Sequence, residues 1–406
     1  MELKVGSWSW AAGLPAVMLR EKTAKKLGVH EKGRLLIRVP STNKKEISAV
    51  LDVVKRKVSK KEIVVSEEVK KILGVKEGQK VEVEISSPPK SLDLIKKKLK
   101  GVVLTKKEVK EIISDIVNNS LSEAEVALFV SAMYQKGMNF DETVFLIDAI
   151  LSTGNRLHFR NKFVVDKHSI GGIPGNRTTP LVVSICSAAG LTFPKSSSRA
   201  ITSAAGTADV IETIANVEFS IKKLKKIIEK TNACMVWGGA LGMVPADSKI
   251  ISIEKQLKID PEAQLLASIL SKKLAAGSKY VLIDIPYGSS AKVSLAKGRR
   301  LKKKFEDLGK YFGLKMKVVL TDGSNPIGRG VGPILEMKDV IDVLDPSEDG
   351  PLDLEDKGAG IFLHVKRGDK IVKKQKILTI YAESKPRLKE ALKFYKQNKP
   401  VDICHI

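Results

Sequence analysis

The sequence is poor in cysteine and aromatic residues, and it has no long apolar run. Its three cysteines, Cys186, Cys234 and Cys404, are far apart and odd in number, so they fit neither a disulfide framework nor a zinc-site spacing. This usage is typical of a reducing, intracellular compartment. The stretch LVVSICSAAG is too short to cross a bilayer, and MELKVGSWSW lacks the regions of a signal peptide. We therefore expect a cytoplasmic protein without a membrane partner.

Positive charge, by contrast, is abundant, and the net charge is +25. Such an excess fits a nucleic-acid binder, a solvated lysine-rich surface or an enzyme for a phosphate-bearing small molecule. The basic residues lie on helix-like stretches such as GRRLKKKFEDLGKYFG, and aromatic residues, 5% of the chain, do not interleave with them. This pattern disfavours a dedicated nucleic-acid surface.

The chain of 406 residues is long enough for several domains. Residues 1–88 contain a weak internal repeat, with LGVHEKGRLLIRV starting at Leu27 and LGVKEGQKVEVEI at Leu73. Each copy alone leaves an apolar face uncovered, so the two halves predict a small N-terminal β-barrel-like domain.

Residues 89–157 predict a helical domain. Thr105, Ser122 and Asn139 each stand three residues before a glutamate and ahead of an apolar run, which is the pattern of a helix start or close to it. Gly137 is the expected stop of one of these helices. A later helical stretch, 245–277, is assigned to the same domain.

Strand-like and helix-like stretches alternate in residues 158–244 and 278–345, which predicts a mostly parallel α/β domain. KFVVD predicts a buried strand, the loop DKHSIGGIPGNRTT follows it, and TPLVVSICSAAG predicts an apolar helix. KYVLIDIPYG and KMKVVLTDG predict two further strands on either side of a helix. Residues 346–406 predict a short C-terminal α+β unit, so the overall fold class is multidomain α/β.

The loop DKHSIGGIPGNRTT has the composition of an anion-binding site. Its glycines permit positive φ and a close approach of the backbone, and its N–H groups can form an anion nest ahead of a helix N-terminus. Lys167, Ser169, Thr178 and Thr179 add donors, and Lys167 adds charge. Since neither GxxxxGK[ST] nor GxGxxG matches, the sequence predicts a phosphate loop of another kind. A structural turn with incidental donors is the alternative.

A second polar segment, SSSRAITSAAGTADVIE, spans 196–212. Buried hydroxyl groups need hydrogen-bond partners, so this dense run predicts a polar binding site, in which Arg199 indicates an anion or a polar ring. A serine-rich helix cap with a surface arginine is the alternative.

These segments together resemble the archaeal AMP phosphorylase branch of the thymidine and pyrimidine nucleoside phosphorylase family. The resemblance covers roughly residues 90–345, including TNACMVWGGAL and PADSKIISIEKQLKIDP, and DKGAGIFLHVKRGD resembles the start of the family's C-terminal domain. It implies phosphorolysis of nucleoside 5′-monophosphates, AMP foremost and CMP and UMP as further candidates, to ribose 1,5-bisphosphate and free base. Inorganic phosphate is then a co-substrate, no cofactor or metal is needed, and a homodimer or larger homo-oligomer is expected.

The resemblance also implies roles for single residues. Asp260 falls where the AMP branch has its proton donor, and His168 and Lys272 fall at base-facing positions, so Asp260 and His168 are the expected catalytic residues. The phosphate-holding positions of the thymidine enzymes correspond to Lys167, Ser169, Thr179, Ser197 and Thr207. The nucleotide-contacting positions correspond to Gly172, Ser198, Arg199, Ala200, Ile201, Thr202, Ser203, Thr207, Ser268, Lys272 and Lys292.

A general acid suits this chemistry, because a purine leaves poorly as an anion. Asp260 fits that role in a buried setting, but an aspartate before a proline is also a common helix start. Lys292 is alternatively a solvated lysine at the end of a strand, and His168 a satisfied loop histidine.

Two features depart from the family pattern. The stretch ILEMKDVIDVLDPSEDGPLDLEDKGAGI joins segments that family members separate by a sizeable α/β block. Ile253 stands where the thymidine enzymes have a pyrimidine-contacting arginine, which argues against strict thymidine specificity. We expect the substrate cleft between the helical and α/β domains. Two alternatives stay open: a thymidine or other pyrimidine nucleoside phosphorylase, and a non-catalytic remnant that binds nucleotides or RNA.

Overall fold

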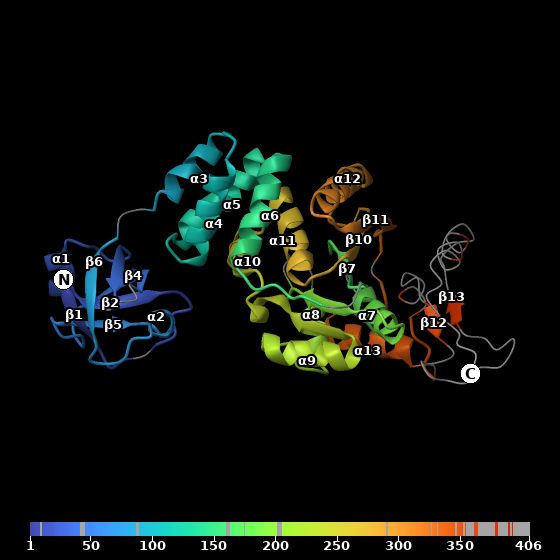
Figure 1. Cartoon of the computed structure of the whole chain (residues 1–406), viewed down its shortest axis with the longest axis horizontal. Coiled ribbons are helices and arrows are strands. Elements are labelled where there is room, and N and C mark those ends of the chain that lie inside the picture. Colours follow the sequence, from blue (N-terminus) through green and yellow to red (C-terminus); the bar gives the residue numbers. More distant parts are fainter. Residues whose placement is uncertain are drawn as a thin grey trace. The chain divides into compact units, whose positions relative to one another are not determined.

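The structure of the protein is a computed structural model, which describes most of residues 1–345. It leaves undescribed Ser9, 41–44, 87–88, 160–162, Pro174, 201–204, Ser290, Pro326 and Val331, and beyond 345 it describes only 347–351, Leu354, 361–363, 378–380, Lys389 and Leu392. The chain divides into two compact units, 1–149 with 249–264 and 150–248 with 265–406. Figure 1 labels the helices and strands of both units. None of the helices described in either unit is both long and apolar enough to span a bilayer.

The N-terminal part of the first unit is a closed six-stranded barrel. Its strands, in the order β1-β5-β2-β4-β3-β6, are β1 (Glu2–Val5), β5 (Glu62–Val65), β2 (Ala16–Arg20), β4 (Glu46–Val54), β3 (Arg34–Arg38) and β6 (Lys80–Ile85). Alternate residues of each strand fill the interior, as Leu35 and Ile37 do. The two copies of the sequence repeat begin at Leu27 and Leu73, which are the last residues of the short helices α1 (Glu21–Leu27) and α2 (Glu67–Leu73).

Helices follow the barrel in the chain. They are α3 (Ser91–Leu99), α4 (Lys106–Val117), α5 (Glu123–Lys136) and α6 (Phe140–Ser152), and most of the later helix α10 (Pro245–Leu257) belongs to the same unit. The capping boxes predicted at Thr105 and Ser122 are confirmed, and Gly137 ends α5 as expected. Asn139 forms the same reciprocal pair, because its side chain accepts from the Glu142 N–H at 2.8 Å while its own N–H donates to Glu142 at 3.0 Å.

The second unit contains the parallel sheet that the sequence predicts. The sheet order is β11 (Lys315–Asp322), β10 (Tyr280–Tyr287) and β7 (Val165–Ser169), and a bridge from Val164 to Thr192 leads to the parallel pair β8 (Phe193–Ser197) and β9 (Ala233–Trp237). Its helical elements are α7 (Thr178–Ala188), α8 (Thr207–Glu212), α9 (Ile221–Thr231), the 3-10 turn η1 (Gly238–Leu241), α11 (Glu262–Ala275), α12 (Leu295–Tyr311) and α13 (Pro333–Leu344). Further on, β12 (Ile361–Leu363) pairs with β13 (Leu378–Ile380), and most of the expected C-terminal unit lies outside the described residues.

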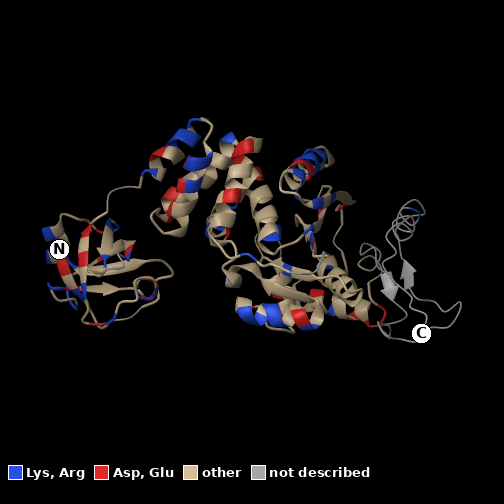
Figure 2. Cartoon of the chain, viewed as in Figure 1, with Lys and Arg blue, Asp and Glu red and all other residues tan. Residues whose placement is uncertain are grey.

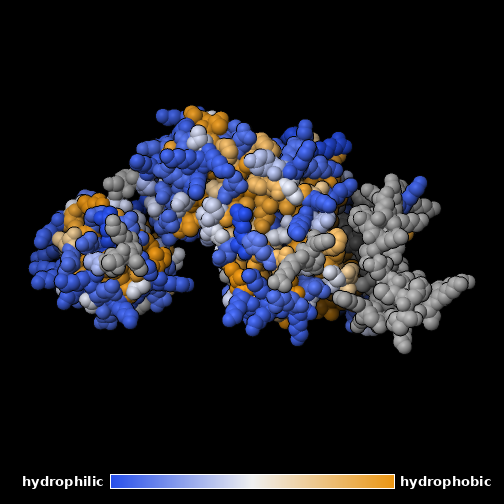
Figure 3. Space-filling view, in the orientation of Figure 1, coloured by the Kyte–Doolittle hydropathy of each residue, from blue (hydrophilic) through white to orange (hydrophobic). Residues whose placement is uncertain are grey.

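The spacing of apolar residues in α12 determines which face of this helix packs on the sheet. It buries Leu301, Phe305 and Leu308, and it contacts β10 and β11. Its other side exposes a run of cations, and Figure 2 shows basic residues gathered on α12 and α9. The space-filling view is correspondingly hydrophilic over much of α12 (Figure 3). The α12 cations are therefore part of a solvated face, as one of the interpretations of the charge predicted.

One boundary prediction is wrong. The sequence placed Lys167, His168 and Ser169 in a loop, whereas they form the second half of β7 and pair with β10. The polar side chains of Lys167 and Ser169 are tolerated there because Thr178 and Asn176 form hydrogen bonds with them. The strands β7, β10 and β11 are parallel, so their carboxyl ends meet at one edge of the sheet, where three glycine-containing loops follow. That edge is where α/β proteins bind their ligands.

Candidate active site

Three glycines shape the loop 170–177 between β7 and α7. Gly171, Gly172 and Gly175 have φ of +83°, +99° and +71°, which is the left-handed region that favours glycine. A Cβ on Gly172 would lie 2.9 Å from the backbone nitrogen of Lys292, and a Cβ on Gly175 would lie 1.8 Å from the carbonyl oxygen of Ile327. The loops that follow β10 and β11 therefore pack backbone to backbone against this loop.

A chain of hydrogen bonds ties the end of β7 to the start of α7. The Lys167 ammonium donates to the Thr178 hydroxyl, which donates to the Asn176 side chain at 3.0 Å. The Asn176 amide donates to the Ser169 hydroxyl at 3.5 Å, and the Gly171 N–H approaches the same hydroxyl at 3.4 Å. Asn176 was not singled out from the sequence, although an amide side chain in a glycine loop that bears several hydroxyls is a recognisable signal. These hydrogen bonds bring the polar side chains of β7 and of the following loop together.

Buried charges surround this loop. Lys167, Lys195, Lys272 and Lys273 are all less than a tenth exposed. The Asp166 carboxylate accepts from Lys273 at 2.9 Å and from Lys195 at 3.4 Å, and Lys195 also donates to the carbonyl oxygen of Lys167.

Lys272 has its own partners on α10 and α11. Its ammonium lies 2.7 Å from an Asp247 oxygen and donates to the Ser268 hydroxyl at 2.9 Å. Lys167 differs from the other three lysines, because within the described chain no carboxylate oxygen lies within 4 Å of its ammonium. An anion bound at this edge would supply a direct ionic partner.

Burial and these neighbouring charges also shift the pKa values of the side chains at the site. Burial lowers the pKa of Lys167, and attraction from Asp284 opposes this effect. Burial lowers the pKa of Lys273 to about 7. Burial, followed by repulsion from Lys273 and the neighbouring lysines, holds the pKa of His168 well below its ordinary value. His168 is thus a neutral imidazole at pH 7, with one N–H donor and one acceptor nitrogen, and it lacks the second ring proton that an imidazolium gives as a general acid.

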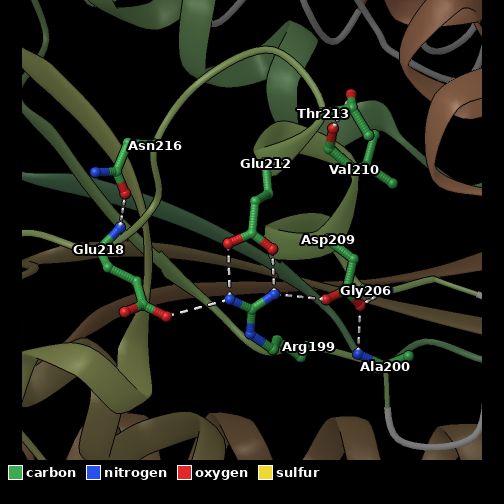
Figure 4. A network of polar contacts seen from close by, with 9 residues as sticks. All are labelled: Arg199, Ala200, Gly206, Asp209, Val210, Glu212, Thr213, Asn216 and Glu218. Atoms are coloured by element: carbon green, nitrogen blue, oxygen red, sulfur yellow. Dashed lines mark hydrogen bonds and ion pairs between the residues drawn. The ribbon is translucent and has the colours of Figure 1, made fainter.

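Arg199, in the hydroxyl-rich segment, forms ion pairs with neighbouring acidic side chains (Figure 4). Its guanidinium binds Glu212 through both terminal nitrogens, with one bond of 2.9 Å, and it lies 3.1 Å from Asp209 and 3.2 Å from Glu218. It also lies over the Trp237 ring, 4.9 Å from the centroid. The hypothesis that Arg199 supplies positive charge to a substrate pocket therefore finds no support in its contacts.

The remaining predicted residues are distributed over several elements. Ser197 ends β8, Ser198 and Ala200 follow it, Thr207 begins α8, and Thr179 is buried in the first turn of α7. Ile201, Thr202 and Ser203 lie outside the described residues.

Asp260 and Ile253 belong to the first unit. Asp260 is partly exposed and lies just before α11, whereas Ile253 is buried in α10. The role of Asp260 and the expected cleft remain predictions.

Helix α13 contributes two acids that sequence reasoning missed. Glu336 forms a buried ion pair with Arg177, the residue that precedes α7, and Arg177 also donates to the Ala205 carbonyl at 2.6 Å. Asp339 accepts from the N–H groups of Arg329 and Gly330, each at 2.8 Å. The stretch DGSNPIGRGVG, a second glycine-rich loop after a strand, was the available signal. Thus α13 anchors both glycine loops.

Known protein families cover much of the chain. It matches the glycosyl transferase family, helical bundle domain, over residues 92–154 and the a/b domain of the same family over 161–299. The pyrimidine nucleoside phosphorylase C-terminal domain matches 351–402.

Individual relatives extend these matches. AMP phosphorylase 1 from Archaeoglobus fulgidus is 42% identical over 351 residues, which cover 86% of this chain and 69% of that protein. AMP phosphorylase from Methanococcus vannielii is 40% identical over 376 residues, 92% of this chain and 74% of that protein. Among solved structures, anthranilate phosphoribosyltransferase (TrpD) from Thermus thermophilus matches with a TM-score of 0.53 and 18% identity, over 66% of this chain and 87% of that chain, which indicates a shared fold.

Proposed function

The chain belongs to the AMP phosphorylase family, and from that membership we propose that it catalyses the phosphorolysis of nucleoside 5′-monophosphates. A phosphate oxygen attacks the anomeric carbon of the ribose, and the bond from that carbon to the base nitrogen breaks. The products are ribose 1,5-bisphosphate and the free base, which takes up one proton as it leaves. AMP is the principal substrate, with CMP and UMP as further substrates.

One observation carries this proposal: the buried ammonium of Lys167 has no carboxylate partner within 4 Å in the described chain. Attraction from Asp284 only partly offsets the cost of burying this cation, and no carboxylate reaches it directly, so the site favours an anion. The positive-φ glycines and the N-terminus of α7 lie beside it and add backbone donors. We assign loop 170–177 as the seat of the attacking phosphate, with Lys167, Ser169, Thr179, Ser197 and Thr207 as its donors.

The nucleotide is assigned to the neighbouring residues Gly172, Ser198, Ala200, Ser268, Lys272 and Lys292. The close packing of Gly172 against Lys292 supports placing these two at one subsite. His168 then faces the base as a neutral hydrogen-bond partner, because its lowered pKa disfavours the imidazolium form that could protonate the leaving group. That proton is assigned to Asp260 as general acid.

Incubation with AMP and inorganic phosphate tests the proposal. We expect adenine to appear only when phosphate is present, and we expect CMP and UMP to be cleaved under the same conditions. Lys167→Gln should raise the KM for phosphate by roughly a hundredfold, on the scale of a lost charge-assisted contact. Lys303→Gln, on the exposed face of α12, is the matched control and should behave as wild type. Cleavage of thymidine but of no nucleotide would overturn the proposal in favour of a pyrimidine nucleoside phosphorylase.

A homo-oligomeric state in the cytoplasm completes the proposed function. It is supported by the substrates, which are intracellular nucleotides, and by the family that the chain belongs to. Light scattering coupled to gel filtration tests it, and a monomeric mass at working concentrations would contradict it.

A further inference from the structure

Asp209 bonds the backbone at two places that lie six residues apart. It is the third residue of α8, and one of its carboxylate oxygens accepts from the Ala200 N–H at 2.8 Å and from the Gly206 N–H at 2.9 Å (Figure 4). The other oxygen lies 3.1 Å from Arg199. A single side chain therefore joins the end of the Ser198–Ala200 stretch to the start of α8.

The backbone is tightly packed at the same point. A Cβ on Gly206 would lie 2.5 Å from the Ser198 carbonyl oxygen and 2.7 Å from the Ala200 nitrogen. Because its φ of −92° is ordinary, the need for glycine here comes from contact and not from backbone strain. The two stretches thus touch directly. The Ala208 N–H donates to the Ser198 carbonyl oxygen at 3.4 Å, and Asp209 adds two shorter hydrogen bonds between them.

Arg199 fixes the carboxylate in turn. It holds Asp209 on one side and Glu212 and Glu218 on the other, and it lies over Trp237. Burial by itself would raise the pKa of Asp209, but the two N–H donors and Arg199 outweigh it and lower that pKa. The side chain therefore stays ionised at neutral pH, when its two backbone hydrogen bonds are strongest.

We propose that Asp209 is a positioning residue for nucleotide binding, and that Arg199 acts through it and not on the substrate. The proposal rests on the proposed function, which assigns Ser198, Ala200 and Thr207 to substrate. These residues lie next to the atoms that Asp209 bonds, so their geometry depends on its carboxylate. Asparagine at this position keeps the size of the side chain but has a single, uncharged acceptor oxygen. Its NH2 group must then face either the two backbone N–H groups or the Arg199 guanidinium, which are donors in both cases.

The experiment compares Asp209→Asn with Glu218→Gln. Both remove a carboxylate from Arg199, but only Asp209 bonds the backbone. We expect Asp209→Asn to raise the KM for AMP about tenfold, with kcat within about twofold, as suits the loss of hydrogen bonds to a charged acceptor. Glu218→Gln should leave both constants near wild type. Equal effects of the two variants would overturn the proposal, because Asp209 would then act only as a charge partner of Arg199.

Hydrogen exchange at the Ala200 and Gly206 amides gives a second readout that needs no substrate. We expect faster exchange in Asp209→Asn and unchanged exchange in Glu218→Gln, with far-UV circular dichroism confirming that both are folded. Unchanged exchange in Asp209→Asn would overturn the positioning role even if activity fell. A wild-type chain that neither binds nor cleaves AMP would instead refute the proposed function and the link to nucleotide, while exchange still reports whether Asp209 holds the two stretches together.

Discussion

At the scale of single residues, the second unit concentrates buried lysines around one aspartate. Lys273 is fully buried, and its ammonium reaches Asp166 at 2.9 Å. A buried ion pair gains Coulomb energy but loses hydration, and the loss commonly exceeds the gain. The cluster is therefore consistent with the proposed phosphate site and is not accounted for by a gain in stability. Lys195 shares the same carboxylate and also holds the carbonyl oxygen of Lys167, so it links the cluster to the proposed phosphate seat.

The protonation of Lys273 leads to a prediction about stability. Burial lowers its pKa from 10.5 to about 7 in the folded chain. Between these values the unfolded chain binds the extra proton, so the free energy of unfolding increases with pH by up to about 1.4 kcal/mol per pH unit from this residue. Lys273→Met should flatten that increase, as measured by urea unfolding across the window.

Lys303→Met is the control, because Lys303 is exposed on α12. It should keep the wild-type pH dependence. A Lys273→Met curve parallel to that of the wild type would mean that Lys273 does not lose its proton in the folded chain over this range.

At the scale of elements, the three loops at the sheet edge are fixed by backbone contact. Gly175 meets Ile327, Gly172 meets Lys292, and Asp339 holds the backbone of Arg329 and Gly330. Each loop thus limits the conformations of its neighbours. We expect the loss of unfolding free energy on replacing a glycine to depend on how closely the added Cβ would approach a neighbouring backbone atom, and not only on the φ of the glycine.

Gly175→Ala and Gly171→Ala separate the two effects. Both glycines have positive φ, but only Gly175 faces a backbone atom, at 1.8 Å, whereas nothing lies within 4 Å of a Cβ on Gly171. We expect Gly171→Ala to cost about 1–2 kcal/mol of unfolding free energy, which is typical of a left-handed alanine. Gly175→Ala should cost more than about 3 kcal/mol, because the backbone must also move. Equal losses in denaturant unfolding would show that loop contact is unimportant.

Local features of these elements could be predicted from sequence, and remote partners could not. The caps at Thr105 and Ser122 were predictable because both partners lie within one turn. The extension of β7 through Ser169 depends on pairing with β10, more than a hundred residues away. The partners of Arg199 could not be predicted for the same kind of reason, since Glu212 at the end of α8 and Glu218 in the following loop lie 13 and 19 residues away and composition alone does not bring them together.

At the scale of the whole molecule, positive charge is the dominant property. The net charge of +25 coincides with exposed cations on α9 and α12 (Figure 2). Proposed substrates that are anions, AMP and phosphate, are attracted by such a field before they touch any particular residue. The field of exposed charges is screened within about 10 Å at an ionic strength of 0.1 M, whereas a buried contact is screened much less.

Because exposed and buried charges are screened differently, the salt dependence distinguishes attraction of the substrate by the surface charge from binding at the site. We expect kcat/KM for AMP to fall as salt rises, and the triple variant Arg299→Gln, Arg300→Gln, Lys303→Gln to lower it by about twofold at low salt and not at high salt. These residues are exposed on α12 and belong to no proposed subsite, so kcat should not change. Lys303→Arg, which keeps the positive charge, is the control and should match wild type at every salt concentration. A triple variant that loses the same factor at low and high salt would mean that α12 contacts the substrate directly, and a kcat/KM independent of salt would mean that the surface charge has no part in capture.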